Sequence, residues 1–446
     1  MSKITRMTIF LLISVSCIFT VLFPISGVSM AERDSPFKIY DEIMVSAVDM
    51  DCNYYLEDHG KNKFNFEYPK LILTDDRDPL IAFVDENSDK LIFAEIADRR
   101  VKIFPSISNT NDRSHKKWPW PIVFARMNRI YLAILPGPWA DKNKQIQIHV
   151  LDRDTKQLHY QTDIAFISSN RCTVGGIYPY NEKYMLVAQC NYICLRYLPL
   201  VLLGGNPTYR YNVSFILDNS KELTMQTIEQ KGCHTVYNQA YDVSSSGSLH
   251  AAWVRDKHGQ VGSKHDETIH YRLNKNGTKW EAPIELYSVK DTEVQRQLKH
   301  LSLANSVSSA FLLWQDVKNG IFVAEVRDGK KNDVIKISDM KKADISGEPL
   351  WFASTIRVAS DNNGNVYALW AQNTGRSYQL YFRSRIHGKW MKEITISRGN
   401  GYLQLPDMKV DKAGKIHITY IKSMNADEPH GKYGCFYMKI ERRKDI

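Results

Sequence analysis

The sequence predicts an all-β fold, a seven-bladed β-propeller of four-stranded antiparallel blades, on three observations. One short pattern recurs along the chain: a polar turn with Gly at a fixed place, then alternating apolar and polar residues that end on an aromatic one. The pattern returns at a period near fifty residues, which is typical of propellers. The composition is that of a globular β protein, with 43% hydrophobic and 11% aromatic residues, 24 of them Tyr.

The clearest copies of the repeat lie at residues 244–253 (SSSGSLHAAW), 360–370 (SDNNGNVYALW) and 411–420 (DKAGKIHITY). Gly supplies the positive φ that a tight turn needs, and the alternation is the period of a strand. Weaker copies complete the set, in steps of 50 to 64 residues, with turns at Asp78, Asn128, Lys183, Gly247, Ser308, Gly364 and Gly414. Six blades are the runner-up, and two stacked β-sandwiches are the alternative architecture.

The second half of each unit also contains two strands. Segments 269–280 and 380–390 each run from a strand through a turn to a Trp, and a further short strand follows. The last unit lacks its fourth strand, because only six residues follow the strand at 435–440. The strand-like segment 39–48 has no unit of its own. We therefore predict that it completes the last sheet, closes the ring and removes an exposed sheet edge.

The first 31 residues have the pattern of a secretory signal. A basic start, Lys3 and Arg6, precedes an apolar run over 7–28, and small residues follow at the expected cleavage site. An uncleaved membrane anchor is the alternative, because the run is long enough to span a bilayer. The prediction is a signal at 1–31 and one propeller domain at 32–446. This domain would be monomeric and secreted or periplasmic, with no membrane span after cleavage.

Six cysteines follow the signal, and an even number of cysteines in an exported chain favours disulfides. Closure of the ring would bring the ends of the chain together, so we predict a disulfide between Cys52 and Cys435. The four middle cysteines would form two disulfides or bind a structural zinc ion, with His234 as an optional ligand. These four are Cys172, Cys190, Cys194 and Cys233. No other cofactor is predicted.

The net charge favours anionic partners. The 59 basic and 49 acidic residues give +10, and without the two basic residues of the signal the charge is +8. A basic exported protein is predisposed toward acidic polysaccharide, lipid headgroups or nucleic acid, although the same charge also serves solubility. Lys and Arg form no block of the nucleic-acid-binding kind, so no nucleic-acid partner is predicted.

The half-unit at 270–280 (HYRLNKNGTKW) resembles the Asp-box, or bacterial neuraminidase repeat, of sialidase-superfamily propellers. That motif is roughly Ser-x-Asp-x-Gly-x-Thr-Trp in a hairpin. Gly277 and Trp280 match it, and Gly388 with Trp390 is a shorter echo. The resemblance implies the propeller fold over roughly residues 39–446. It also implies a glycan ligand, because that superfamily includes glycosidases, polysaccharide lyases and non-catalytic glycan binders.

The chain departs from this family at several places. Leu273, Lys275 and Lys279 stand where the motif has Ser, Asp and Thr. The Phe/Tyr-Arg-Ile-Pro tetrapeptide of sialidases, which bears the first arginine of a carboxylate-binding triad, is absent from the sequence. The family's Tyr and Glu nucleophile pair has no local motif here either. The resemblance therefore carries over no catalytic residue, and a functional expectation based on it rests partly on fold analogy.

In the sialidase-superfamily propellers that this chain resembles, the Asp-box hairpins lie on the face away from the ligand. We therefore expect the ligand at the connections between blades and at the loops between second and third strands. Arg, His and Tyr side chains from these segments would bind a uronate or sialate carboxylate and move protons; packing, capping or solvated roles are the alternatives. The candidate catalytic residues are His234, Tyr237, His265 and Asp316, and the candidate ligand-binding residues are Arg255, His258, Lys264, Arg376 and His430.

The predicted function is a secreted propeller that binds or cleaves an acidic polysaccharide or a sialoglycan. As an enzyme it would be a sialidase-like glycosidase that works through carboxylates, or a lyase that removes a proton beside a uronate carboxylate. A non-catalytic glycan-binding module and a protein-interaction propeller are the alternatives. The sequence has no phosphate-binding P-loop, zinc-protease helix or serine-hydrolase elbow.

Overall fold

The computed structural model describes the strands of the chain and the shorter turns between them. The described residues are 35–48, 69–74, 77–85, 90–104, 107–108, 122–126, 129–134, 145–165, 172–180, 183–193, 208–217, 223–228, 235–244, 246–258, 265–275, 279–292, 297–306, 308–339, 356–373, 377–400, 403–423 and 433–443. All the regular elements among them are β-strands, and no helix in this part of the chain could cross a membrane. The signal predicted at 1–31 lies outside the described residues.

Nearly all the strands belong to one compact unit, Ile39–Glu441. The other unit comprises Met1–Lys38 and Arg442–Ile446. Within that smaller unit, the Arg443 amide donates a hydrogen bond to the Pro36 carbonyl oxygen (2.9 Å).

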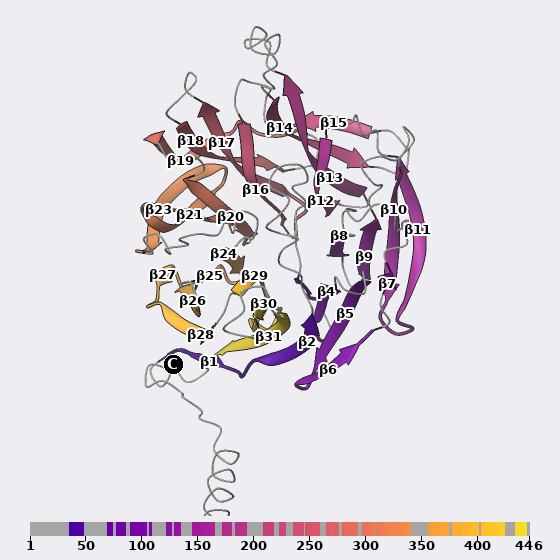
Figure 1. The fold of residues 1–446 in the computed structure, drawn as a ribbon. Helices are drawn as coiled ribbons and strands as arrows, with labels where there is room; N and C mark the ends of the chain where they lie inside the picture. Colours follow the sequence, from indigo (N-terminus) through magenta and orange to yellow (C-terminus); the bar gives the residue numbers. More distant parts are fainter. Residues whose placement is uncertain are drawn as a thin grey trace, which may run out of the picture. The chain divides into compact units, whose positions relative to one another are not determined.

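The described strands form seven antiparallel sheets (Figure 1). The first sheet has β3 (Lys70–Ile72), β4 (Leu80–Asp85), β5 (Lys90–Ala97) and β6 (Arg100–Ile103), with β7 (Ile107–Ser108) also beside β5. The second has β8 (Ile122–Arg126), β9 (Arg129–Ile134), β10 (Gln145–Asp152) and β11 (Gln157–Ala165). The third has β12 (Cys172–Tyr180), β13 (Lys183–Ile193), β14 (Thr208–Leu217) and β15 (Leu223–Thr227).

The remaining sheets follow the same order. The fourth has β16 (Thr235–Val243), β17 (Leu249–His258), β18 (His265–Asn274) and β19 (Ile284–Thr292). The fifth has β20 (Leu298–Asn305), β21 (Ser309–Asp316), β22 (Gly320–Arg327) and β23 (Lys330–Ser338). The sixth has β24 (Ile356–Ser360), β25 (Val366–Asn373) and β26 (Ser377–Ile386), followed by β27 (Lys389–Trp390) and β28 (Ile394–Asn400), which both pair with β26.

The last sheet is completed by the N-terminal segment. It has β29 (Leu403–Val410), β30 (Ile416–Ser423) and β31 (Tyr433–Arg442), and β31 also pairs with β1 (Phe37–Ile39) and β2 (Ile43–Val48). The register of β2 sets Ile43 opposite Tyr437 and Val48 opposite Tyr433. The pairing predicted for segment 39–48 is thus present.

The first strands of successive sheets contact one another in an unbroken circuit. The order is β3, β8, β12, β16, β20, β24, β29 and back to β3. In each sheet the later strands follow outward from this first strand in chain order. This arrangement of antiparallel four-stranded units is a β-propeller.

Three turns between first and second strands have the geometry that the sequence repeat predicts. Gly247, Gly364 and Gly414 have φ of 82°, 78° and 78°, in the left-handed region that favours Gly. The amide of each donates to the carbonyl oxygen three residues earlier, at 2.9, 3.2 and 3.0 Å. In the last of these turns, Asp411 also accepts the Lys415 amide through its side chain (2.8 Å).

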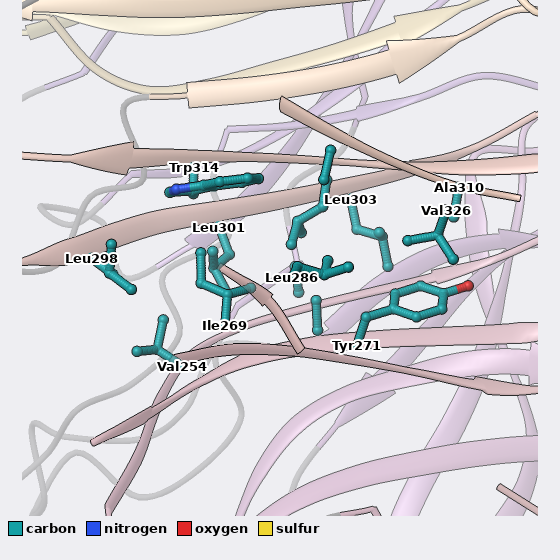
Figure 2. Packing of buried hydrophobic residues seen from close by; sticks show 14 of the residues in the cluster. Val254, Ile269, Tyr271, Leu286, Leu298, Leu301, Leu303, Ala310, Trp314 and Val326 are labelled. Atoms are coloured by element: carbon teal, nitrogen blue, oxygen red, sulfur yellow. The ribbon is translucent and has the colours of Figure 1, made fainter. Parts of the chain in front are cut away.

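The aromatic residues that end the repeats form the core between the sheets. Trp253, Trp314, Trp370 and Tyr420 are all fully buried. Figure 2 shows one cluster, where Ile269 and Tyr271 of the fourth sheet lie near the labelled residues of the fifth sheet. The periodic apolar positions of adjacent sheets therefore pack against each other, which is how a propeller buries its sheet faces.

The two Asp-box-like half-units carry matching arginine contacts. Arg272 donates through Nε to the Glu281 carbonyl oxygen (2.5 Å) and through Nη1 to the carbonyl oxygen of Ile228. Arg383 makes the equivalent bonds to Met391 (2.8 Å) and to Ile337. Each guanidinium thus joins its own hairpin to the preceding sheet, so this half of the repeat serves packing.

The structure contradicts the predicted disulfide between Cys52 and Cys435 at Cys435, the one cysteine of the pair that it describes. Cys435 is a free thiol and is 0% exposed. Its position in the sheet lies opposite Ser46 of β2, and its sulfur lies in an apolar cluster with Val45 and Ile421. The strand position beside the thiol is thus taken by Ser46, and the cysteine packs as a small hydrophobic residue. Cys52 lies outside the described residues.

Candidate functional site

The structure describes three of the nine candidate side chains, Tyr237, Arg255 and Asp316. His258 and His265 are described as strand positions only. The other four candidates, His234, Lys264, Arg376 and His430, lie outside the described residues. The candidate site is therefore built from the described ends of the strands that border these segments.

Asp316 is a buried turn cap at the end of β21. Its carboxylate accepts hydrogen bonds from the amides of Lys318 (3.0 Å) and Asn319 (3.1 Å) and from the Asn319 side chain (2.8 Å). Gln297 Nε2 (2.9 Å) and the Tyr287 hydroxyl (3.0 Å) also donate to it. Five donors on one carboxylate fit the capping alternative for this residue better than a catalytic acid.

A pair of buried carboxylates lies next to Asp316, and the sequence patterns did not single it out. Asp256 of β17 stands opposite Glu267 of β18, and the two residues are 2% and 0% exposed. Glu267 accepts the amides of Gln297 (3.0 Å) and Leu298 (2.7 Å) at the start of the next sheet. Both residues border the connection between the second and third strands of this sheet, which is one of the kinds of segment where the sequence predicts the ligand.

The pKa of Glu267 is raised, and burial is the largest cause. The facing charge of Asp256 raises it further, whereas the two amides and the hydroxyl of Tyr237 lower it. The predicted residue Tyr237 therefore lies beside a carboxyl group that takes up a proton more readily than usual. Both carboxylates are almost completely covered, and Glu267 joins the fourth sheet to the start of the fifth through these two amides.

The innermost strands are irregular at equivalent places. The pairing of β16 with β17 and of β20 with β21 shifts register between Tyr237 and Ala240 and between Lys299 and Ser302. Within these bulges, Asn238 (φ 45°) and His300 (φ 56°) adopt left-handed conformations, which are uncommon outside Gly. Bulges of this kind re-aim side chains and are frequent next to functional sites.

His300 is a half-buried imidazole that feels the charges of two nearby cations. Burial is the main cause that lowers the pKa of His300 to about 3, and the charges of Lys299 and Arg357 lower it further. Arg357 belongs to the next inner strand, β24, and its Nε lies 3.7 Å from Oδ1 of Asp407 on β29. Neighbouring inner strands thus gather two cations, one carboxylate and a neutral imidazole.

We call this group the inner-strand site. It consists of Asn238, Lys299, His300, Arg357 and Asp407. The site is fixed by contacts between strands, because Asn238 Nδ2 donates to the Leu298 carbonyl oxygen (3.0 Å) and Asp407 Oδ2 accepts the Leu71 amide (2.8 Å). His300 was not among the candidate residues, although it lies where one repeat unit is connected to the next, and the sequence gave no signal for Arg357 or Asp407, which read as ordinary strand residues.

No group of three or more potential metal ligands is present among the side chains that the structure describes. The four cysteines proposed for zinc are not among these side chains. Two of them are described by strand position, and the register sets Cys172 of β12 opposite Cys190 of β13. Cys194 and Cys233 lie outside the described residues.

Comparisons with known proteins give matches in structure only. No protein-family model matches the chain, and no curated protein matches it. A protein of unknown function from Dyadobacter fermentans is 12% identical, with coverage of 92% of this chain and 100% of that one and a TM-score of 0.40. The α-L-arabinanase of Penicillium chrysogenum in complex with arabinobiose is 9% identical, with coverage of 81% and 98% and a TM-score of 0.40.

A third similar structure is the GH93 α-L-arabinofuranosidase of Fusarium graminearum with arabinobiose. It is 10% identical, with coverage of 81% of this chain and 98% of that one and a TM-score of 0.42. Likenesses at this level carry no argument about the activity of this chain. The propeller assignment rests on the sheet order itself, and the Asp-box resemblance remains a resemblance of motif.

Proposed function

We propose that the protein binds an anionic glycan at the inner-strand site and acts on it as a uronate lyase. The observation that carries this proposal is the bulge that holds His300 in a left-handed conformation beside Lys299 on β20, near enough to Arg357 of the next inner strand for both charges to help lower the pKa of His300. Two cations on adjacent strands suit a sugar carboxylate. A neutral imidazole beside them suits the removal of a proton from the carbon that bears this carboxylate.

The elimination step requires one base and one leaving group. His300 would take the proton beside the carboxylate, the electron pair would form a carbon–carbon double bond, and the bond to the leaving sugar oxygen would break as that oxygen takes a proton from water. A bound carboxylate would also offset the two positive charges that lower the His300 pKa. That pKa would then move toward the neutral range, where a general base is most effective.

Glycoside hydrolysis has less support among the described residues. It needs two carboxyl groups that reach the sugar, and the pair that faces each other here, Asp256 and Glu267, is covered, with Glu267 also bonded to the start of the next sheet. A sialoglycan remains the alternative anionic ligand. The protein would be exported to the periplasm or the medium, where it would meet polymeric glycans. Arg255, Arg376 and the other predicted loop residues would make further contacts with the ligand.

The test separates binding from elimination. Purified protein is incubated with polyuronates and with sialosides; an unsaturated product absorbs in the ultraviolet, whereas hydrolysis only releases new reducing ends. Arg357→Gln should weaken binding of the polyuronate about tenfold or more, and the loss should shrink as salt rises. Arg99→Gln is the matched control, because Arg99 pairs with Asp41 at an exposed position.

His300→Asn tests the base, because Asn tolerates the left-handed backbone and cannot take the proton as imidazole does. Binding should persist while the absorbing product disappears. Product formation by this variant at the wild-type rate would contradict the lyase. Binding without any product from the wild type would leave a glycan-binding module, and no acidic ligand at all would favour the protein-interaction alternative.

A further inference from the structure

Two inner strands use residues at equivalent places to hold the next sheet. The pairing with the second strand shifts register just before Ser302 in β20 and just before Asp407 in β29. Ser302 Oγ accepts the Val358 amide of β24 (3.0 Å), and Asp407 Oδ2 accepts the Leu71 amide of β3 (2.8 Å). The two side chains thus make the same kind of contact between neighbouring sheets.

The negative charge of Asp407 is not needed for this contact. At the equivalent place a neutral hydroxyl, that of Ser302, accepts the amide. A carboxylate that is removed from water is costly unless donors or a cation compensate for the lost hydration, and the Asp407 side chain is only 16% exposed. The charge therefore indicates a second role for Asp407, beyond the contact between sheets.

Arg357 of the sixth sheet is the partner of this charge. Its Nε lies 3.7 Å from Oδ1 of Asp407, which is the separation of an ion pair rather than of a hydrogen bond. Its Nη1 donates to the Ile356 carbonyl oxygen (2.9 Å), and its Nη2 forms no hydrogen bond with the described part of the chain. The guanidinium is thus held at two of its nitrogens, and Nη2 is left for an incoming anion.

The Asp407 carboxylate is itself fixed by two backbone amides. The Leu71 amide donates to Oδ2 (2.8 Å), and the Met408 amide donates to Oδ1 (3.0 Å). Because Leu71 belongs to the first sheet, its hydrogen bond to Asp407 exists only when the last sheet lies against the first one. Closure of the ring and the ion pair with Arg357 therefore depend on the same carboxylate.

We infer that Asp407 is a positioning residue, which orients the Arg357 guanidinium for the sugar carboxylate and makes this orientation depend on closure of the ring. The inference rests on the proposed anion-binding role of Arg357. An arginine that is already held in place loses less side-chain freedom when the ligand binds, so its orientation adds affinity. The charge of Asp407 by itself repels an anion. The two effects have opposite signs, so a measured affinity separates them.

The experiment is a calorimetric titration of the full chain with an oligogalacturonate. Asp407→Asn keeps an oxygen for the Leu71 amide and loses the charge that attracts Arg357, so its affinity should fall about fivefold. The double variant Asp407→Asn/Arg357→Gln should bind no more weakly than Arg357→Gln alone, because a residue that acts through Arg357 has no effect in its absence. A residue with a purely structural role would weaken binding in both backgrounds.

The matched control is Asp242→Asn. Asp242 also lies on an inner strand, β16, and its Oδ2 accepts the Asn305 amide of the next sheet (2.9 Å). The control therefore removes a carboxylate charge from the same kind of contact between sheets, without Arg357 beside it. It should retain the wild-type affinity, and urea unfolding shows whether each variant is folded.

A second measurement needs no ligand. In NMR spectra of the arginine side chains, the Nε–H signal of Arg357 is assigned by its loss in Arg357→Gln. This signal should move in Asp407→Asn and stay in place in Asp242→Asn. If the wild type binds no polyuronate, the proposed function fails, and the signal alone decides whether Asp407 positions Arg357. Affinity in Asp407→Asn equal to or above that of the wild type, or an unchanged signal, would overturn the inference and leave the proposed function standing.

Discussion

Glu42 and Lys422, 380 positions apart in the chain, form an ion pair where the N-terminal segment completes the last sheet. The same carboxylate accepts hydrogen bonds from the hydroxyls of Tyr420 and of Ser397, which belongs to the preceding sheet. The three donors come from β28 and β30. One side chain thus joins the closing segment to two sheets, so the closure depends on a polar contact as well as on the pairing of β2 with β31.

Glu42→Gln should lower the free energy of unfolding by about 2 kcal/mol at neutral pH, because a partly buried charged partner of Lys422 is lost. Burial would raise the pKa of Glu42, but the hydrogen bonds from Lys422, Ser397 and Tyr420 outweigh it and hold that pKa below its usual value. A depressed carboxyl pKa stabilises the fold above the unfolded value. This contribution is lost as the pH falls through the folded value.

Urea unfolding at pH 7 and in mild acid measures this difference. The gap between wild type and Glu42→Gln should narrow as the pH falls below about 4. Asp41→Asn is the control at the adjacent position, since Asp41 pairs with Arg99 in the open and such pairs contribute about 0–1 kcal/mol. Equal losses for the two variants would show that the closure does not depend on Glu42.

Gly414→Ala should cost about 1–2 kcal/mol, because alanine at a left-handed φ meets its own backbone. Gly414 has φ of 78°, and a Cβ built there meets nothing within 4 Å. The cost is therefore conformational, and Gly414→Asn should recover part of it, since Asn tolerates this region. Chemical unfolding compares the three chains. Alanine and asparagine variants of equal stability would argue against the turn geometry.

These glycine turns could be predicted from the sequence because their cause is local. Gly, polar capping residues and alternation occur within about ten positions, and the same ten positions recur. The closing strand was also predictable, because a unit without a fourth strand and a strand without a unit are both visible in the sequence. Cys435 could have been placed in the core by its apolar neighbours. The disulfide was predicted because cysteines of an exported chain are exposed to oxidation, and the apolar residues around Cys435 were not taken into account.

The candidate site was less predictable because it depends on register and on irregular backbone. Asp256 and Glu267 face each other because of the register between β17 and β18. This register cannot be read from the sequence of residues 259–264, which connect the two strands. The bulge that turns His300 to a left-handed conformation has no Gly or Pro to mark it. Arg357 and Asp407 are far apart in sequence and meet only because successive inner strands are neighbours.

Register also makes a prediction for the middle cysteines. Cys172 stands opposite Cys190 on adjacent antiparallel strands, and the Cα separation of directly opposite residues lies in the range that a disulfide accepts. In an oxidising compartment, exchange with a disulfide oxidant would form this bond and release the reduced oxidant. Peptide mapping without reduction should then recover the two cysteines as one linked peptide, which would narrow the choice between disulfides and zinc.

Cys435 serves as the internal control in that experiment. Burial raises the pKa of its thiol to about 12, so it should resist alkylation in the folded chain and react fully once the chain is unfolded. Separate alkylated peptides for Cys172 and Cys190 would reject their bond. A peptide that links Cys435 to Cys52 would reject the free thiol at the closure.

The last prediction concerns His300 and acid. Burial, with the charges of Lys299 and Arg357, lowers its pKa to about 3, whereas an unfolded histidine titrates near 6.5. Between these values the unfolded chain binds a proton that the folded chain does not, so stability must fall as the pH falls from about 6.5 toward about 3. His300→Asn should therefore reduce the slope of the free energy of unfolding against pH by the equivalent of up to about one bound proton. His159→Gln, at an exposed position, should keep the wild-type slope. The measurement is the free energy of unfolding in urea at several pH values. An unchanged slope in His300→Asn would mean that burial and the nearby charges do not hold the imidazole neutral, and the proposed base would lose its physical support.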